Sequence, residues 1–144
     1  MEETVIVIML KDAETGFLDK ELGCYKIEKG EELIYNTYAY LSPDGGYKVV
    51  MKLSTGGDVS DWEFQAIYDY YDKETLLPFV SSIYEDEDCY NPTWIAELDF
   101  TDSEEEMESR ISNIINAHKK ELESVYEAIA DKRNDYLDYE DEKS

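Results

Sequence analysis

Apolar side chains recur every three or four positions through the last third of the chain, and this pattern constrains the fold more than any other feature. The residues on the repeat are Met107, Ile111, Ile114, His118, Leu122, Val125 and Ile129. Ser103, followed three residues later by Glu106, matches a capping box, and the acidic first turn suits the positive end of a helix dipole. We therefore predict one amphipathic helix over residues 103–134, with an apolar face that needs a surface to cover it.

The residues before this helix predict mainly strands. Extended segments are expected at 4–10, 17–28, 33–41, 47–53, 79–84 and 93–100, from β-branched runs and from alternation of apolar and polar residues. A turn at 42–46, with the sequence SPDGG, predicts a hairpin. A shorter helix is predicted over residues 58–72, with Asp58 or Ser60 as its cap.

These elements predict a single α+β domain over residues 1–134. Its sheet is expected to be antiparallel with about five to six strands, and both helices should pack on one face. Residues 135–144 should form an acidic, frayed tail. The predicted core contains Ile6, Ile8, Trp62, Ile67, Trp94, Ile111, Ile114 and Leu122.

The net charge of the chain excludes several kinds of partner. It has 36 acidic and 13 basic residues in a length of 144, which gives a formal charge of −23. Such a charge disfavours direct binding to nucleic acid and to anionic membranes. The apolar run at 5–10 is too short to span a bilayer and follows two glutamates, so it resembles neither a membrane helix nor a signal peptide. We expect a cytoplasmic protein, and charge crowding predicts that mild acidification stabilises it.

The sequence contains no recognisable catalytic or metal-binding pattern. Its one histidine, His118, lies on the apolar repeat and is expected to be a packed structural residue. Cys24 and Cys89 have no metal-binding spacing and are expected to be buried free thiols. The acidic run at 85–88 lacks the calcium-loop pattern, and no phosphate-binding glycine motif occurs. We therefore expect no enzyme activity, no metal site and no cofactor.

Three segments resemble a known family. They are residues 11–23, residues 61–69 and residues 90–93, with the sequences KDAETGFLDKELG, DWEFQAIYD and YNPT. Together they resemble small acidic proteins of unknown function from anaerobic Gram-positive bacteria. The resemblance covers most of the chain and implies a bacterial cytosolic origin. It implies no activity, so it assigns a role to no residue.

Two functional hypotheses remain at this point. In the first, carboxylates engage a basic protein surface and imitate a nucleic-acid phosphate backbone, with a nucleic-acid-binding protein as the partner. The residues predicted to bind are Glu85, Asp86, Glu87, Asp88, Asp102, Glu104, Glu105 and Glu108. In the second, the chain is a structural or regulatory domain, with a homodimer as one option, and its acidity serves only solubility. Mimicry requires a continuous acidic stripe, whereas a solubility role predicts interspersed lysines.

Overall fold

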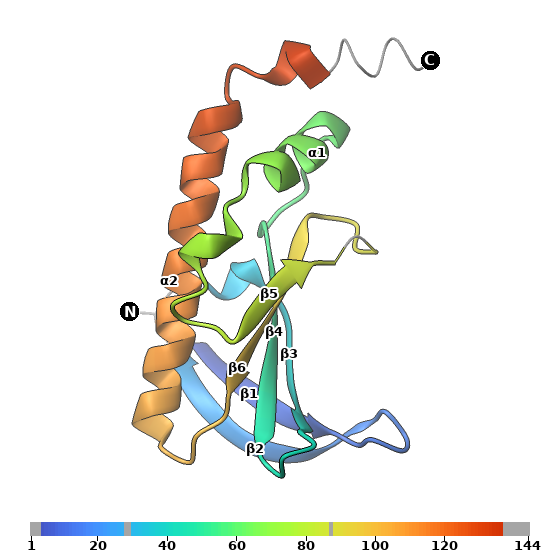
Figure 1. Cartoon of the computed structure of the whole chain (residues 1–144), viewed down its shortest axis with the longest axis vertical. Helices are drawn as coiled ribbons and strands as arrows, with labels where there is room; N and C mark the ends of the chain where they lie inside the picture. The colour runs from blue at the N-terminus through green and yellow to red at the C-terminus, as the bar shows by residue number, and fades with distance from the viewer. Residues whose placement is uncertain (1–3, 28–29, 87, 137–144) are drawn as a thin grey trace.

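The computed structural model describes residues 4–27, 30–86 and 88–136 and confirms the α+β prediction. A six-stranded sheet has the order β2-β1-β3-β4-β6-β5 (Figure 1). The strands are β1 (Thr4–Lys11), β2 (Leu18–Ile27), β3 (Ile34–Leu41), β4 (Tyr47–Ser54), β5 (Ser82–Glu85) and β6 (Thr93–Asp99). The helices are α1 (Asp61–Tyr70) and α2 (Glu104–Ile129), and the short 3-10 helices are η1 (Glu31–Leu33) and η2 (Lys73–Thr75).

The sheet is mostly antiparallel, as predicted, and differs from the prediction in one parallel pair of strands. β1 and β3 are parallel neighbours, paired at Leu10 and Ala39, and the other neighbouring strands are antiparallel. The cause is the path of the chain. β2 returns antiparallel to β1, and the connection through η1 then crosses β1, so β3 runs opposite to β2 and along β1.

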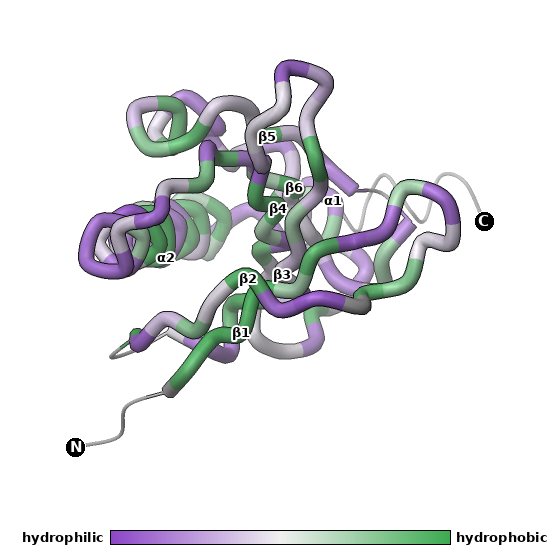
Figure 2. Tube along the Cα trace, turned by 90° about the horizontal axis from the view of Figure 1, so that it is seen from below, coloured by the Kyte–Doolittle hydropathy of each residue, from purple (hydrophilic) through white to green (hydrophobic). Residues whose placement is uncertain are grey.

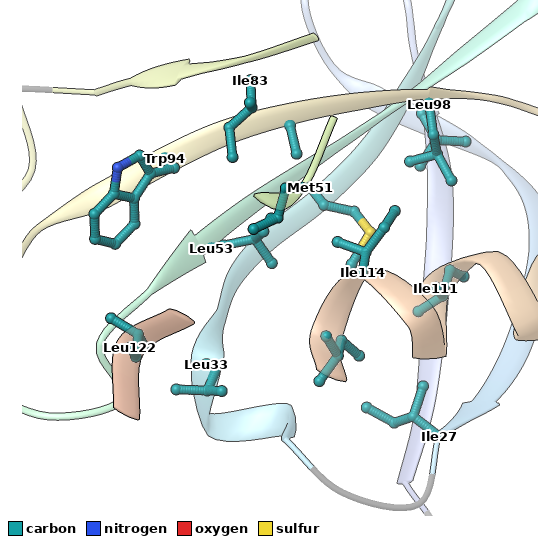
Figure 3. Close-up of a cluster of buried hydrophobic side chains, with 14 of the residues drawn as sticks. Ile27, Leu33, Met51, Leu53, Ile83, Trp94, Leu98, Ile111, Ile114 and Leu122 are labelled. Atoms are coloured by element: carbon teal, nitrogen blue, oxygen red, sulfur yellow. The ribbon is translucent and has the colours of Figure 1, made fainter. Parts of the chain in front are cut away.

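The apolar face of α2 packs on the sheet, as its repeat predicts. The seven residues of the repeat are all buried, and Ile115 joins them. Figure 2 shows the hydrophobic side of α2 turned towards the strands and its hydrophilic side turned outward. In Figure 3 the core is formed by Ile111 and Ile114 of α2 together with Met51, Leu53 and Leu98 of the sheet.

Seven of the eight predicted core residues are buried, and the prediction for Trp62 is wrong. Trp62 is only partly buried, because it lies on the first turn of α1, whose buried stripe is Ala66 and Ile67. α1 packs against α2 at the upper end of the molecule in Figure 1. There the Trp62 ring meets Tyr136, with 6.3 Å between ring centroids.

α2 ends at Ile129, five residues before the predicted boundary. The chain turns at 130–132, and residues 133–136 form a short helical turn. This turn lets the Tyr136 hydroxyl donate to a carboxylate oxygen of Asp69 at 2.7 Å, so a contact with α1 accompanies the early end of the helix. The predicted frayed tail lies outside the described residues from 137 onward. None of the described helices has the length and apolar character that a membrane span requires.

Candidate functional site

The predicted acids of the β5–β6 hairpin are largely held in ion pairs. A carboxylate oxygen of Glu85 lies 3.0 Å from Nζ of Lys73, and one of Asp86 lies 3.4 Å from Nζ of Lys52. Both acids are half-buried, whereas Asp88 is exposed. The predicted Glu87 lies outside the described residues. Asp88 is therefore the described acid of this loop that projects freely.

The hydrogen bonds of Asp86 show what holds the loop in shape. Burial alone would raise the pKa of Asp86, but hydrogen bonds from the Cys89 thiol, the Asp88 N–H and Lys52 lower this pKa overall. For Glu85, burial is the largest effect and would raise the pKa, but the hydrogen bond and charge of Lys73 together with a backbone hydrogen bond lower this pKa overall. Both carboxylates stay charged at neutral pH and fix the loop.

The other predicted acids lie at the far end of the same strand. Asp102, Glu104 and Glu105 are exposed around the start of α2, and Glu108 is half-buried. The acids of the β5–β6 loop precede β6, and the acids at the start of α2 follow it (Figure 1). The two groups are therefore separated by the seven residues of β6, which correspond to ~20 Å of strand. The structure therefore places the predicted residues in two groups and does not bring them into one site.

A second segment joins the hairpin acids in space. Asp58, in the loop before α1, accepts a hydrogen bond from the Asn91 side chain at 3.1 Å. The Tyr68 hydroxyl of α1 lies 3.1 Å from the backbone oxygens of Asp86 and Thr93, and accepts from the Thr93 N–H at 2.9 Å. These bonds tie α1 and the loop before it to the hairpin.

We call the resulting surface the acidic end, and its residues are Asp58, Asp61, Asp86, Asp88 and Tyr90. Asp58, Asp61 and Asp88 are exposed, and Tyr90 is 82% exposed. No lysine or arginine occurs in residues 54–72 or 86–92 of the sequence. Sequence reasoning missed Asp58 and Asp61, because it considered Asp58 only as a helix cap and assigned no role to Asp61. The signal available in the sequence was the absence of lysine and arginine from residues 54–72.

His118 lies in a closed aromatic cluster and has no route to a substrate. Its side chain is 0% exposed, and its Nε2 lies 2.7 Å from the Ser54 carbonyl oxygen. A carbonyl only accepts, so Nε2 carries the proton and Nδ1 accepts from the Tyr71 hydroxyl at 2.8 Å. Burial lowers the pKa of His118 to about 4, with a smaller opposing effect of the bond to Ser54. The prediction of a packed structural histidine is confirmed.

The exposure of the two cysteines differs from the prediction. Both are free, but Cys24 is exposed and Cys89 is half-buried, so the expectation of buried thiols is wrong. Cys24 lies on the edge strand β2 opposite Val7, which is itself exposed. Within the described part of the chain, no three or more His, Cys, Asp or Glu side chains are grouped to hold a metal ion.

The chain belongs to the family of unknown function DUF6762, whose family model matches residues 1–137. This match confirms the expectation of an uncharacterised family, while the bacterial origin stays an expectation. No curated protein and no solved structure matches the chain. The functional argument therefore depends on the surface itself.

Proposed function

We propose that this protein is a non-enzymatic binding protein whose acidic end docks on a compact basic patch of a partner protein. The observation that carries the proposal is the meeting of two segments without a base, residues 58–68 and the hairpin residues 86 and 88–92, through the bonds of Asp58 with Asn91 and of Tyr68 with Asp86. Exposed like charges held together repel one another, and a basic partner removes that repulsion. Docking therefore relieves a cost that the folded protein carries alone.

The bases that contact the hairpin do not neutralise this surface. Lys52 is engaged by Asp86, and Lys73 by Glu85. Asp58, Asp61 and Asp88 form no ion pair within the described ranges. These three carboxylates are therefore the ones that remain available to lysine or arginine side chains of a partner.

Tyr90 adds apolar contact to the same surface. It lies between Asp88 and Asn91 in the hairpin loop, and most of its side chain is in solvent. Tyrosine is enriched among residues that dominate binding energy, and its ring attracts lysine and arginine side chains. A basic partner would thus meet both carboxylates and an aromatic ring.

The charge pattern of α2 favours a compact patch over a long imitation of a phosphate backbone. Residues 109–120 contain Arg110, Lys119 and Lys120 and no acid. The acidic turns at the start of α2 are therefore not continued along the helix as a stripe. A basic loop or short segment fits this arrangement better than a groove shaped for duplex nucleic acid, and nucleic-acid-binding proteins commonly present such basic patches.

The proposal places the protein in the cytoplasm. Cys24 and Cys89 are both free and more than slightly exposed, which suits a reducing compartment. The competing hypothesis is a structural or regulatory domain whose acidity serves only solubility, and the same experiment decides between the two.

The test is a pull-down from cell lysate with two charge-matched variants. One variant neutralises the acidic end by Asp58→Asn, Asp61→Asn and Asp88→Asn. The control neutralises the start of α2 by Asp102→Asn, Glu104→Gln and Glu105→Gln. We expect wild type and control to capture the same basic proteins at low salt and the first variant to lose them.

Two outcomes would contradict the proposal. Captured proteins without basic character would remove its charge argument. Equal loss by both variants would show that only the net charge matters, and the solubility hypothesis would then stand.

A further inference from the structure

A groove runs between α2 and the connection from η2 to β5. It consists of two adjoining hollows of about 340 and about 470 Å³, which share Phe79 and Asn113 in their walls. Figure 1 shows the connection passing alongside the middle of α2. Each hollow falls within the size range of small-molecule sites, about 300–1,000 Å³. The groove lies apart from the acidic end and takes no part in the proposed function.

The α2 wall of the groove is basic and polar in a chain that is otherwise strongly acidic. It presents Arg110, Asn113, Asn116 and Lys120 from the stretch of α2 that contains no acid, and its one acid from α2 is Glu121 at the end of the groove. The groove therefore coincides with the basic stretch of α2. This coincidence indicates a ligand of opposite charge.

The acids in the lining are already engaged by other groups. Asp99 forms an ion pair with Lys48, and Glu121 accepts a hydrogen bond from the Asp72 N–H at 2.9 Å. Lys120 is exposed and forms no ion pair in the described part of the chain. Its ammonium group is therefore available to an anion that enters the groove.

Arg110 supplies a fixed wall of the groove, and Phe79 supplies an aromatic one. The guanidinium of Arg110 donates to the Asp99 carbonyl oxygen at 2.8 Å and to Glu106 at 3.0 Å, which holds it in place. The Phe79 ring is 41% exposed and lines both hollows. An exposed aromatic ring beside a cation suits a molecule that has an apolar part and a charged part.

We propose that this groove binds a small organic anion. Its apolar ring or chain lies against Phe79, its carboxylate or phosphate pairs with Lys120, and the side-chain amides of Asn113 and Asn116 donate to its polar atoms. Binding is reversible and involves no chemical step.

The probe is an aromatic sulfonate, 8-anilinonaphthalene-1-sulfonate, followed by its fluorescence in a titration at low salt. Lys120→Glu should weaken its affinity about tenfold, through loss of one attractive charge and gain of a repulsive one. Lys119→Glu is the matched control, since it makes the same charge change on the neighbouring residue, which does not line the groove. The control should bind the probe as wild type does.

Two further measurements locate the binding. N-phenyl-1-naphthylamine, which lacks the sulfonate, should respond much less to Lys120→Glu than the anion does. In nitrogen-15 NMR spectra the probe should shift the side-chain amide signals of Asn113 and Asn116 and leave those of Asn36 on β3 unchanged. Circular dichroism of each variant confirms that it is folded.

The proposal is overturned by three results. They are absence of saturable binding, equal weakening by Lys119→Glu and Lys120→Glu, and unchanged Asn113 and Asn116 signals at saturating probe. None of them bears on the acidic end, since that surface is tested with other variants.

Discussion

Acidification from pH 7.5 to pH 5 should destabilise this protein through His118. The histidine is fully buried, and burial lowers its pKa from the ordinary 6.5 to about 4. In the unfolded chain the imidazole is solvated and takes up a proton near pH 6.5. The unfolded state therefore binds more protons than the native state between these two values, and stability falls as the pH falls through that window.

The surroundings of His118 offer no charge that would offset this effect. Its contacts are the Ser54 carbonyl of β4, the Trp94 ring of β6 and the Tyr71 side chain just after α1. Burial, with a smaller effect of Glu121, raises the pKa of Tyr71 far above neutrality, so its hydroxyl keeps its proton. A protonated His118 would also lose the bond that its Nδ1 accepts.

The size of the effect follows from the two pKa values. Two and a half pKa units correspond to about 3 kcal/mol when the window is fully crossed. At pH 5 the native histidine is still mainly neutral and the unfolded one mainly charged, so the free energy of unfolding is about 2 kcal/mol lower than at pH 7.5. That is a large part of the 5–15 kcal/mol that typically stabilises a domain.

Urea denaturation at pH 7.5, 6.5, 5.5 and 5.0 measures this loss, with His118→Gln as the reference. Glutamine has both an acceptor for Tyr71 and a donor for Ser54, but it does not titrate. The difference in unfolding free energy between wild type and variant should shrink by about 2 kcal/mol across this range. Subtraction cancels the carboxylates that both proteins share.

A constant difference between the two proteins from pH 7.5 to 5 would refute this reasoning. It would mean that the native structure accepts a proton at His118 without cost. The carboxylates with resolved shifts do not compete in this range, because the pKa values of Asp12, Asp44, Glu85 and Asp86 are all lowered. Their contribution is lost only as the pH falls through those lowered values. Charge crowding acts in the opposite direction to His118, because it predicts that mild acid stabilises the fold.

Three substitutions test the packing. Leu122→Ala removes a side chain that is 3% exposed and should lower the unfolding free energy by ~2–5 kcal/mol, so an unchanged urea midpoint would count against the assigned face of α2. Gly30→Ala should destabilise more than Gly45→Ala in thermal melts, because both glycines have positive φ but only at Gly30 would an added Cβ clash with the Ile115 side chain; equal losses would argue against that clash. Ser103→Ala should cost about 1 kcal/mol in urea denaturation through loss of the α2 cap, and no loss would show that the cap is unimportant.

Local patterns predicted the parts of the fold that depend on neighbours in sequence. The repeat from Met107 to Ile129 identified α2 and its buried face, since helical spacing is a property of consecutive residues. The parallel pairing of β1 with β3 depends on which side of β1 the chain crosses, and nothing in either strand encodes it. The end of α2 is a second example. It is accompanied by a hydrogen bond of Tyr136 to Asp69, 67 positions earlier in the chain, and a local pattern does not report such a contact.

The candidate site shows the same limit. Runs of acids in sequence indicated the hairpin and the start of α2, but the two lie at opposite ends of β6. Asp58 was overlooked because its link to the hairpin is a bond to Asn91, 33 residues later. Which charges share a surface is decided by such contacts, and composition does not report them.

The most direct test of the acidic end is the association rate constant with a captured basic partner, measured at two ionic strengths. Neutralising Asp58, Asp61 and Asp88 should slow association at low salt and change dissociation less, and high salt should remove most of the difference, since screening shortens to ~3 Å at 1 M. The control changes at Asp102, Glu104 and Glu105 should leave the rate close to that of wild type. If wild type and both variants associate at the same rate at low salt, the acidic end does not dock on a basic partner and the central claim is wrong.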